Sequence, residues 1–201
     1  MVSENKTVAI LVGHEFEDIE MEYCLLQLSH QGADVQLVPI NAGFNAHEGS
    51  DQEPVRGRFG TPAPPIILQE GVHYTVADLE ELDAESIDCI LFPGGFSPDH
   101  LRSVSEVIEL TKEIFEAGKL VAAICHGPWI LVEADLIEDR EVCGVQEIHT
   151  DLANAGATVK DTGTVRDGNI VTGRRPDNLP EFCETIADAL ESEEVTQATD
   201  D

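Results

Sequence analysis

The chain has 201 residues, 42% of them hydrophobic, which is typical of one folded domain with a substantial core rather than of a disordered acidic chain. Forty Asp and Glu against eleven Lys and Arg give a formal net charge of −29. Such a surface repels nucleic acid and anionic membranes, so neither is expected as a partner. The acidic residues are spread over the whole length, which favours adaptation to the salt-rich cytosol of a halophile over a local site for a basic partner.

The cysteine pattern and the first residues indicate where the protein resides. Its five cysteines are widely spaced and form no C-x-x-C pair, as is typical of reduced thiols inside a cell rather than of a disulfide scaffold or a zinc site. The start, MVSENKTVAILV, has no charged region, long apolar stretch or cleavage site of a signal peptide. No apolar run has the length of a membrane span. We therefore expect a cytoplasmic protein, and we expect no metal and no cofactor.

The first third of the chain predicts a strand, a helix and a second strand. The strands are Thr7–Val12 and Asp34–Ile40, and the helix between them ends near His30. This opening favours a parallel sheet with a right-handed crossover. The inward stripe of the helix is predicted to contain these residues: Phe16, Ile19, Tyr23, Leu26 and His30. Residues 43–75 mix Gly, Pro and charge without periodicity, so they are predicted to form a long surface excursion.

The remaining chain continues the alternation of strands and helices. The predicted strands are, in order, Ile66–Leu68, Val72–Thr75, Ile87–Phe92 and Lys119–Ile124, followed by a hairpin over Thr158–Val171 that turns at Asp167-Gly168. The predicted helices are Ala77–Leu82, Ser103–Ala117, Pro128–Ala134 and Asn178–Leu190. The pattern predicts a single α/β domain over residues 1–190 with a mostly parallel central sheet, and an acidic frayed tail over residues 191–201.

The segment LVAAICHGPWILVEA, residues 120–134, contains the strongest candidate for a catalytic group. Ala123-x-Cys125-x-Gly127 has the spacing of a nucleophile elbow, where a sharp strand-to-helix turn raises one side chain above the sheet edge. Pro128 fits the first helical turn. The positive end of that helix is expected to favour the thiolate of Cys125. From this segment alone, a buried structural cysteine in a parallel strand is the alternative.

Two further segments follow predicted parallel strands, His14–Glu20 and Pro93–Asp99. They end at the carboxyl edge of the sheet, where open α/β sheets bind ligands. Gly94 and Gly95 offer unhindered backbone N–H groups, as an oxyanion hole requires, and a simple turn is the alternative. The acidic residues that open the first helix are also explained by the helix dipole alone.

Four segments in this order resemble the PfpI branch of the PfpI/ThiJ superfamily. They read EFEDIE (15–20), LFPGGFSPD (91–99), AICHGP (123–128) and GRRPDNLP (173–180). The resemblance covers roughly residues 7–42 and 76–190. It implies a flavodoxin-like three-layer sandwich of the class I glutamine amidotransferase-like kind, and a homo-oligomer, either a dimer or a larger assembly.

The resemblance also implies roles for individual residues. Cys125 corresponds to the family's reactive elbow cysteine and His126 to the histidine that follows it. Glu20 matches the glutamate that hydrogen-bonds the cysteine sulfur, which requires a proton on the carboxyl when the thiolate is present. Asp99 matches an acidic residue that reaches the histidine of a neighbouring subunit and completes a Cys-His-acid triad.

Further positions follow from the same matched segments. Gly95 and the backbone N–H of His126 match oxyanion-hole donors, with Gly94 as another candidate, and Glu17 and Arg174 are candidates for the pocket. Two features depart from the family. Val145-Gln146-Glu147 stands where many members have Tyr-Pro-Gly, and the excursion 43–75 is longer than the usual connection.

The predicted function is that of a cysteine-dependent hydrolase or lyase in which Cys125 attacks an electrophilic carbonyl. The family is described as intracellular protease, deglycase and glyoxalase III, so the expected substrate is a small carbonyl compound, a peptide or a glycated molecule. An alternative of a different class is a non-enzymatic redox or stress sensor, in which Cys125 oxidises reversibly beside Glu20. A binding domain with an inert cysteine is the third interpretation.

Overall fold

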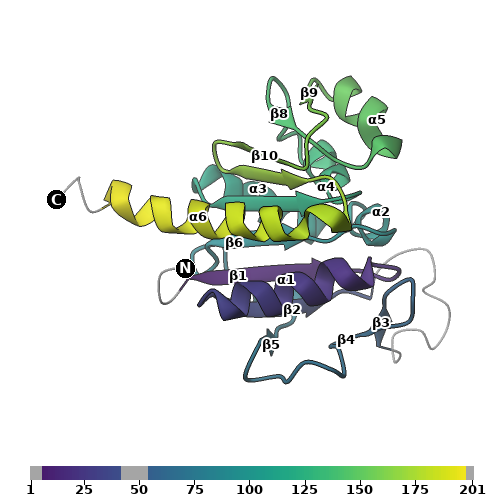
Figure 1. The fold of residues 1–201 in the computed structure, drawn as a ribbon, viewed down its shortest axis with the longest axis vertical. Coiled ribbons are helices and arrows are strands. Elements are labelled where there is room, and N and C mark those ends of the chain that lie inside the picture. Colours follow the sequence, from purple (N-terminus) through teal and green to yellow (C-terminus); the bar gives the residue numbers. More distant parts are fainter. Residues whose placement is uncertain (1–5, 42–53, 198–201) are drawn as a thin grey trace.

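A seven-stranded sheet forms the centre of the protein (Figure 1). The computed structural model describes residues 6–41 and 54–197, with side chains described to residue 192. The strands are β1 (Thr7–Val12), β2 (Asp34–Pro39), β5 (Thr75–Val76), β6 (Cys89–Phe92), β7 (Leu120–Ile124), β10 (Thr164–Asp167) and β11 (Ile170–Gly173). Their order is β10-β11-β7-β6-β1-β2-β5. Every neighbouring pair is parallel except β10 and β11, so the predicted α/β class with a mostly parallel sheet is confirmed.

Helices cover both faces of this sheet and complete three layers, as expected for a flavodoxin-like sandwich (Figure 1). One face carries α1 (Asp18–His30) and α6 (Leu179–Gln197). The other face carries α2 (Ser97–Leu101), α3 (Ser105–Glu116), α4 (Pro128–Glu133) and α5 (His149–Asn154). Because both faces are buried, the central strands are apolar at every position: Val8 and Ile10 of β1 pack toward α1 and α6, and Ala9 packs toward the opposite layer.

Small elements lie at the margins of the sandwich. Two short ladders pair β3 (Val55–Arg56) with β4 (Pro62–Ala63) and β8 (Glu141–Val142) with β9 (Thr158–Val159). The described residues also form the 3₁₀ helices η2 (Leu79–Glu81), η3 (Gln146–Ile148) and η4 (Pro176–Asn178). Within the described ranges, no helix is both long enough and apolar enough to cross a membrane.

The predicted inward stripe of α1 is wrong. The buried residues of this helix are Asp18, Glu20, Met21, Cys24, Leu25 and Leu28. Ile19 is exposed, Tyr23 and Leu26 are half-buried, and His30 is exposed. The predicted stripe is in phase with Phe16, which is buried but lies before the helix, in an isolated bridge with Gly95. The helical period therefore begins after Phe16, and it turns two carboxylic side chains inward.

The structure differs from the prediction at the C-terminal end of the excursion and just after it. Ile66–Leu68 forms no strand, and Ile66 is exposed, while the strand expected at Val72–Thr75 is β5, Thr75–Val76. The helix expected at Ala77–Leu82 is only the 3₁₀ turn η2. Residues 42–53 lie outside the described residues.

The last third contains three further differences. The helix predicted from residue 103 is α3, Ser105–Glu116, and the short α2 before it was missed. The hairpin is formed by β10 and β11, whereas Thr158 belongs to β9 and pairs with β8. The C-terminal helix continues to Gln197, so residues 191–197 are helical where a frayed tail was predicted, and residues 198–201 lie outside the described residues.

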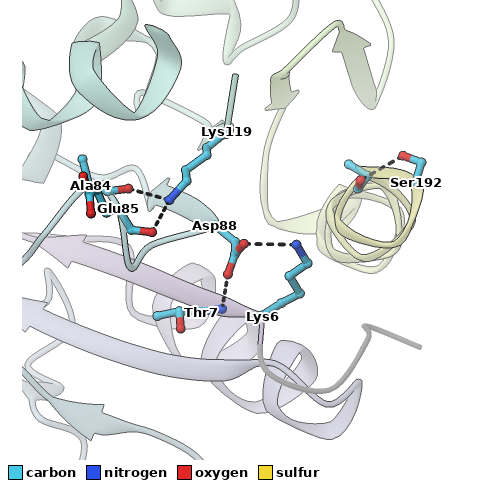
Figure 2. A network of polar contacts seen from close by, with 8 residues as sticks. Lys6, Thr7, Ala84, Glu85, Asp88, Lys119 and Ser192 are labelled. Atoms are coloured by element: carbon cyan, nitrogen blue, oxygen red, sulfur yellow. Dashed lines mark hydrogen bonds and ion pairs between the residues drawn. The ribbon is translucent and has the colours of Figure 1, made fainter. Parts of the chain in front are cut away.

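Polar contacts tie the loops at the amino ends of the central strands (Figure 2). Asp88, just before β6, accepts hydrogen bonds from Lys6 Nζ at 3.1 Å and Thr7 N at 2.9 Å. Lys119, just before β7, donates through Nζ to the carbonyl oxygens of Ala84 and Glu85, each at 2.6 Å. These contacts fix the start of β1, β6 and β7. The candidate site lies at the opposite, carboxyl edge of the sheet, where open α/β sheets bind ligands.

Candidate active site

Cys125 stands at the carboxyl end of β7, in a sharply turned backbone. Its φ is +63°, a left-handed conformation that costs a residue other than glycine about 1–2 kcal/mol. Gly127 N donates to Ile124 O at 2.7 Å and closes the turn. A side chain on Gly127 would bring its Cβ within 2.5 Å of Phe92 O. The predicted nucleophile elbow is therefore present, and α4 starts directly after it at Pro128.

The two other predicted segments meet beside this elbow. Glu17 N donates to Gly94 O at 3.1 Å, and Phe96 N donates to Glu15 O at 2.9 Å. Gly95 has a φ of +73°, and a Cβ there would overlap Glu15 O. Close backbone approach thus brings the segments 14–20 and 93–99 together at the sheet edge, as the sequence predicted.

Two backbone N–H groups are directed at the Cys125 sulfur, and they belong to Gly95 and His126. Donors that meet at the nucleophile are placed to stabilise the oxyanion that forms when it attacks a carbonyl. Gly94 has a different contact, since its N–H donates to Glu20 Oε2 at 2.6 Å. Of the two glycines predicted as oxyanion donors, Gly95 alone has its N–H at the sulfur. Gly94 instead makes room, because a Cβ there would lie 2.6 Å from Cys125 Cβ.

Glu20 is completely buried against the cysteine. Burial raises the pKa of its carboxyl from 4.5 to about 8, and the Gly94 N–H opposes this only in part. At neutral pH the carboxyl therefore carries a proton. The carboxyl interacts with the Cys125 side chain, and Glu20 Oε2 and Cys125 Sγ lie 2.9 and 3.0 Å from the position that a Cβ on Gly94 would take. Glu20 Oε1 is buried and has no hydrogen-bond partner among the described residues. Glu20 thus lies beside the sulfur, where the family resemblance places it, and its role in tuning the thiol stays a prediction.

The pKa of the Cys125 thiol is raised well above its usual range, first by burial and second by the negative charge of Glu20 when that residue ionises. The N–H groups of Gly95 and His126 oppose the rise. The expectation that the following helix favours the thiolate is wrong in this structure, because α4 has only six residues and the sulfur is buried. A thiolate at this position depends on a neutral Glu20 and on the two N–H donors.

His126 is close enough to exchange a proton with the thiol. Its Nδ1 lies 3.4 Å from Cys125 Sγ. The ring stacks on Phe96 with centroids 6.4 Å apart and lies 5.1 Å from the ring of Trp129. Burial lowers the pKa of the imidazole, Glu147 opposes this and Arg58 adds to it. A neutral imidazole, able to accept a proton, is the form favoured at neutral pH.

Asp99 is exposed on α2. Within the described residues of a single copy, no hydrogen bond or ion pair joins Asp99 to His126. The carboxylate of the same chain that acts electrostatically on His126 is Glu147, in the segment that departs from the family pattern. The triad role of Asp99 across a subunit interface stays a prediction.

The two pocket candidates lie in different places. Glu17 accepts a hydrogen bond from Arg58 Nη1 at 3.3 Å, and its charge raises the pKa of Glu20, so it belongs to the site. Arg174 pairs with Asp161 and acts electrostatically on Cys143, and no recorded contact within the described ranges joins it to Cys125.

Sequence reasoning missed Arg58 and the loop that carries it. Asp18, which is buried, accepts hydrogen bonds from Phe59 N and Thr61 N, both at 2.9 Å, and holds this loop against the start of α1. The repeated glycines of RGRFG (56–60) are the only sequence signal of a tight turn there.

An elbow cysteine on the carboxyl edge of a doubly wound sheet, with a buried glutamic acid beside it, defines a class of α/β proteins. The family model described as "DJ-1/PfpI family" matches residues 6–189, and the chain belongs to this family. The resemblance found in the sequence is therefore confirmed.

Named relatives and a solved structure agree with this assignment. The chain is 37% identical over 178 residues to "Putative cysteine protease YraA" of Bacillus subtilis, covering 89% of this chain and 94% of the relative. It is 34% identical over 179 residues to "Protein/nucleic acid deglycase 2" of Escherichia coli, with the same two coverages of 89% and 94%. A two-domain protein of Anabaena variabilis with DJ-1/ThiJ/PfpI-like and ferritin-like domains superposes with a TM-score of 0.77 at 32% identity. The match covers 92% of this chain and 48% of that protein.

Proposed function

We propose that this protein is a cysteine-dependent hydrolase or lyase in which Cys125 attacks an electrophilic carbonyl. The observation that carries the proposal is the convergence of four groups on one sulfur: the Glu20 carboxyl, the N–H groups of Gly95 and His126, and His126 Nδ1. A structural cysteine has no need of this set of donors and acceptors. The names of two relatives, a cysteine protease and a deglycase, are those of activities of this kind.

Each of these groups has a role in the addition of the sulfur to a carbonyl. The resting sulfur is a thiol, and the neutral His126 takes its proton as the sulfur forms a bond to the carbonyl carbon. The electron pair of the carbonyl moves to oxygen, where the N–H groups of Gly95 and His126 stabilise it. His126 then returns the proton to the oxygen or to the leaving group. Glu20 stays protonated throughout and donates to the sulfur.

Three activities share this reaction class: protease, deglycase and glyoxalase III. The site favours those with smaller substrates. Cys125 is only 8% exposed, Phe96 stacks on the neighbouring His126, and Arg58 lies 6.0 Å from the Phe96 ring. A small aldehyde or a glycated adduct reaches such a sulfur more readily than a folded polypeptide does, so deglycase or glyoxalase III-like activity is proposed ahead of proteolysis. The proposal includes a cytoplasmic homo-oligomer in which Asp99 of a second copy orients His126.

A redox sensor is the second candidate, and the same contacts favour it. A sulfur oxidised beside a protonated Glu20 and two N–H groups gains hydrogen bonds to its new oxygen atoms. The two candidates differ in what they require, because a sensor uses Cys125 and Glu20 and needs no general base.

The test compares the wild type with Cys125→Ala and Asp99→Ala in concentrated salt, which screens the net charge of −29. Methylglyoxal turnover, deglycation and peptide cleavage are measured for each, with Cys143→Ala as a control that removes another buried thiol. We expect Cys125→Ala to abolish the activity that the wild type shows and Cys143→Ala to keep it.

Two outcomes would contradict the proposal. Activity that survives Cys125→Ala would exclude the cysteine mechanism. A wild type that is inert in all three assays, but whose Cys125 oxidises selectively under mild peroxide, would establish the sensor instead. Light scattering tests the role of Asp99, since a monomer has no second copy to supply it.

A further inference from the structure

Arg58 is a cation beside the Cys125 site. We propose that Arg58 makes this site selective for small carbonyl compounds that carry a carboxylate, of which 2-oxo acids are the simplest. In this role it is a specificity-determining residue whose guanidinium binds the carboxylate of the compound while Cys125 attacks the neighbouring carbonyl. Turnover of such compounds rests on the proposed function, whereas recognition of the anion can be measured without turnover.

Phe96 and His126 connect Arg58 to the Cys125 sulfur. Its guanidinium carbon lies 6.0 Å from the centroid of the Phe96 ring and 5.6 Å from that of Phe59. Phe96 in turn stacks on His126, whose Nδ1 is 3.4 Å from Cys125 Sγ. The charge of Arg58 acts on His126 and on Glu20, which places the guanidinium within electrostatic reach of both neighbours of the sulfur.

The backbone on both sides of Arg58 is held in place. Arg58 N donates to Phe16 O at 3.0 Å, and the next residue, Phe59, donates its N–H to the buried carboxylate of Asp18. The short ladder of β3 and β4 closes the loop from the outside. Arg58 is therefore a positioned cation, as a binding group must be, and not a surface side chain on a free segment.

Part of the guanidinium is directed to solvent. Arg58 meets Glu17 through the single nitrogen Nη1, and its side chain is 44% exposed whereas that of Glu17 is 12% exposed. A guanidinium has five N–H donors in a planar fork that matches a carboxylate. The ion pair with Glu17 thus orients the fork and leaves donors for a ligand.

The charge of the whole chain makes this placement selective. A surface with a net charge of −29 repels small anions, and a local cation beside the sulfur reverses that preference only where the reaction occurs. The addition itself balances without another reagent: the sulfur–carbon bond forms, the carbonyl electron pair moves to oxygen, and the proton taken from the thiol by His126 returns to that oxygen. The carboxylate stays unchanged throughout.

Alkylation of Cys125 tests the inference with two reagents of nearly equal shape, iodoacetate and iodoacetamide. Each forms a sulfur–carbon bond and releases iodide, but only iodoacetate carries a carboxylate. Peptide mass spectrometry gives the rate constant at Cys125 for each, in constant salt and at one pH. Both reagents need the same thiolate, so their ratio is independent of any change in the pKa of Cys125.

We expect Arg58→Gln to lower the iodoacetate-to-iodoacetamide ratio at least about fivefold, and Arg58→Lys to retain part of it. The control is Arg56→Gln at the end of β3, just before the loop, which removes a guanidinium that donates to Gly60 O at 3.3 Å. Its ratio should stay within about twofold of the wild type. Lower salt should lower the ratio of Arg58→Gln, because the net charge of −29 then repels iodoacetate more strongly, and it should lower the wild-type ratio less.

An unchanged ratio in Arg58→Gln, or an equal fall in Arg56→Gln, would overturn the inference and reduce Arg58 to the structural partner of Glu17. A second measurement compares kcat/KM for glyoxylate and for methylglyoxal. Arg58→Gln should lower kcat/KM for glyoxylate more than kcat/KM for methylglyoxal. If the wild type turns over neither compound, its glyoxalase III-like activity is excluded, and the alkylation ratio still decides whether Arg58 recognises the anion.

Discussion

Replacing Glu20 by glutamine tests the electrostatics of the site, because Glu20 is a buried carboxyl that is protonated at neutral pH. Glutamine keeps the shape of the side chain, an oxygen to accept the Gly94 N–H and a donor toward the sulfur, but it never ionises. We expect the wild type and Glu20→Gln to have similar free energies of unfolding near pH 4. The variant should then become progressively more stable than the wild type as the pH rises.

The sign and the size follow from the pKa of Glu20. Burial raises it from 4.5 in the unfolded chain to about 8 in the folded protein, so between these values the folded state holds a proton that the unfolded state has lost. The wild-type free energy of unfolding therefore falls across this window, and the loss is complete only above the folded-state pKa. The difference between the two pKa values corresponds to about 5 kcal/mol. Relaxation around the charge reduces this, so we expect about 2–4 kcal/mol between pH 4 and pH 9.

Urea unfolding at several pH values in constant, concentrated salt measures this difference. The many other carboxyl groups titrate equally in both proteins and cancel when the variant is compared with the wild type. Glu184→Gln, which removes an exposed carboxyl from α6, is the matched control and should show no comparable trend. A wild-type-to-variant difference that stays constant from pH 4 to pH 9 would show that Glu20 is not held in its neutral form.

Two further substitutions test how the site is built. Gly95→Ala should lower the free energy of unfolding by about 3 kcal/mol and abolish activity, because a Cβ there overlaps a backbone carbonyl oxygen. Gly118→Ala has a similar φ of +76° but open space at its Cβ, so in urea unfolding it should cost only about 1 kcal/mol. Equal losses in the two variants would contradict the close approach. Asp18→Asn should increase the rate of tryptic cleavage in the loop 57–61 about tenfold, because an amide cannot accept both backbone hydrogen bonds. Asp188→Asn, at an exposed position on α6, should leave that rate unchanged, and an equal rate in Asp18→Asn would show that this carboxylate does not hold the loop.

The central sheet and the elbow could be predicted from sequence because each has a local signal. Strands buried on both faces, such as β1 and β7, appear as continuous apolar runs, and the turn at Cys125 needs small neighbours at fixed spacing. Because the carboxyl ends of parallel strands lie at one edge of the sheet, the segments 14–20 and 93–99 could be predicted to lie near each other. These features depend on residues that are close in sequence or on a topology that the βαβ order determines.

The phase of α1 and the role of Arg58 could not be predicted in this way. Whether Glu20 points inward depends on where the helix begins, and a one-residue error turns a buried carboxyl into a solvated one. Arg58 lies in an aperiodic segment, and its position is determined by a buried aspartate about forty residues earlier in the chain. No hydrogen bond or ion pair of the Asp99 carboxylate is recorded within the described residues of one copy, so neither sequence nor a single chain decides its role.

Three groups in contact, Glu20, Cys125 and His126, all have their neutral forms favoured by burial. The resting site is therefore without net charge of its own, and a negative charge arises only when the sulfur attacks a carbonyl. The nearby cation, Arg58, is then not needed to balance a resting thiolate, and its pairing with Glu17 is only partial. A partly paired cation near a neutral nucleophile can bind a negatively charged substrate. We therefore infer that Arg58 determines the selectivity of this site for such substrates.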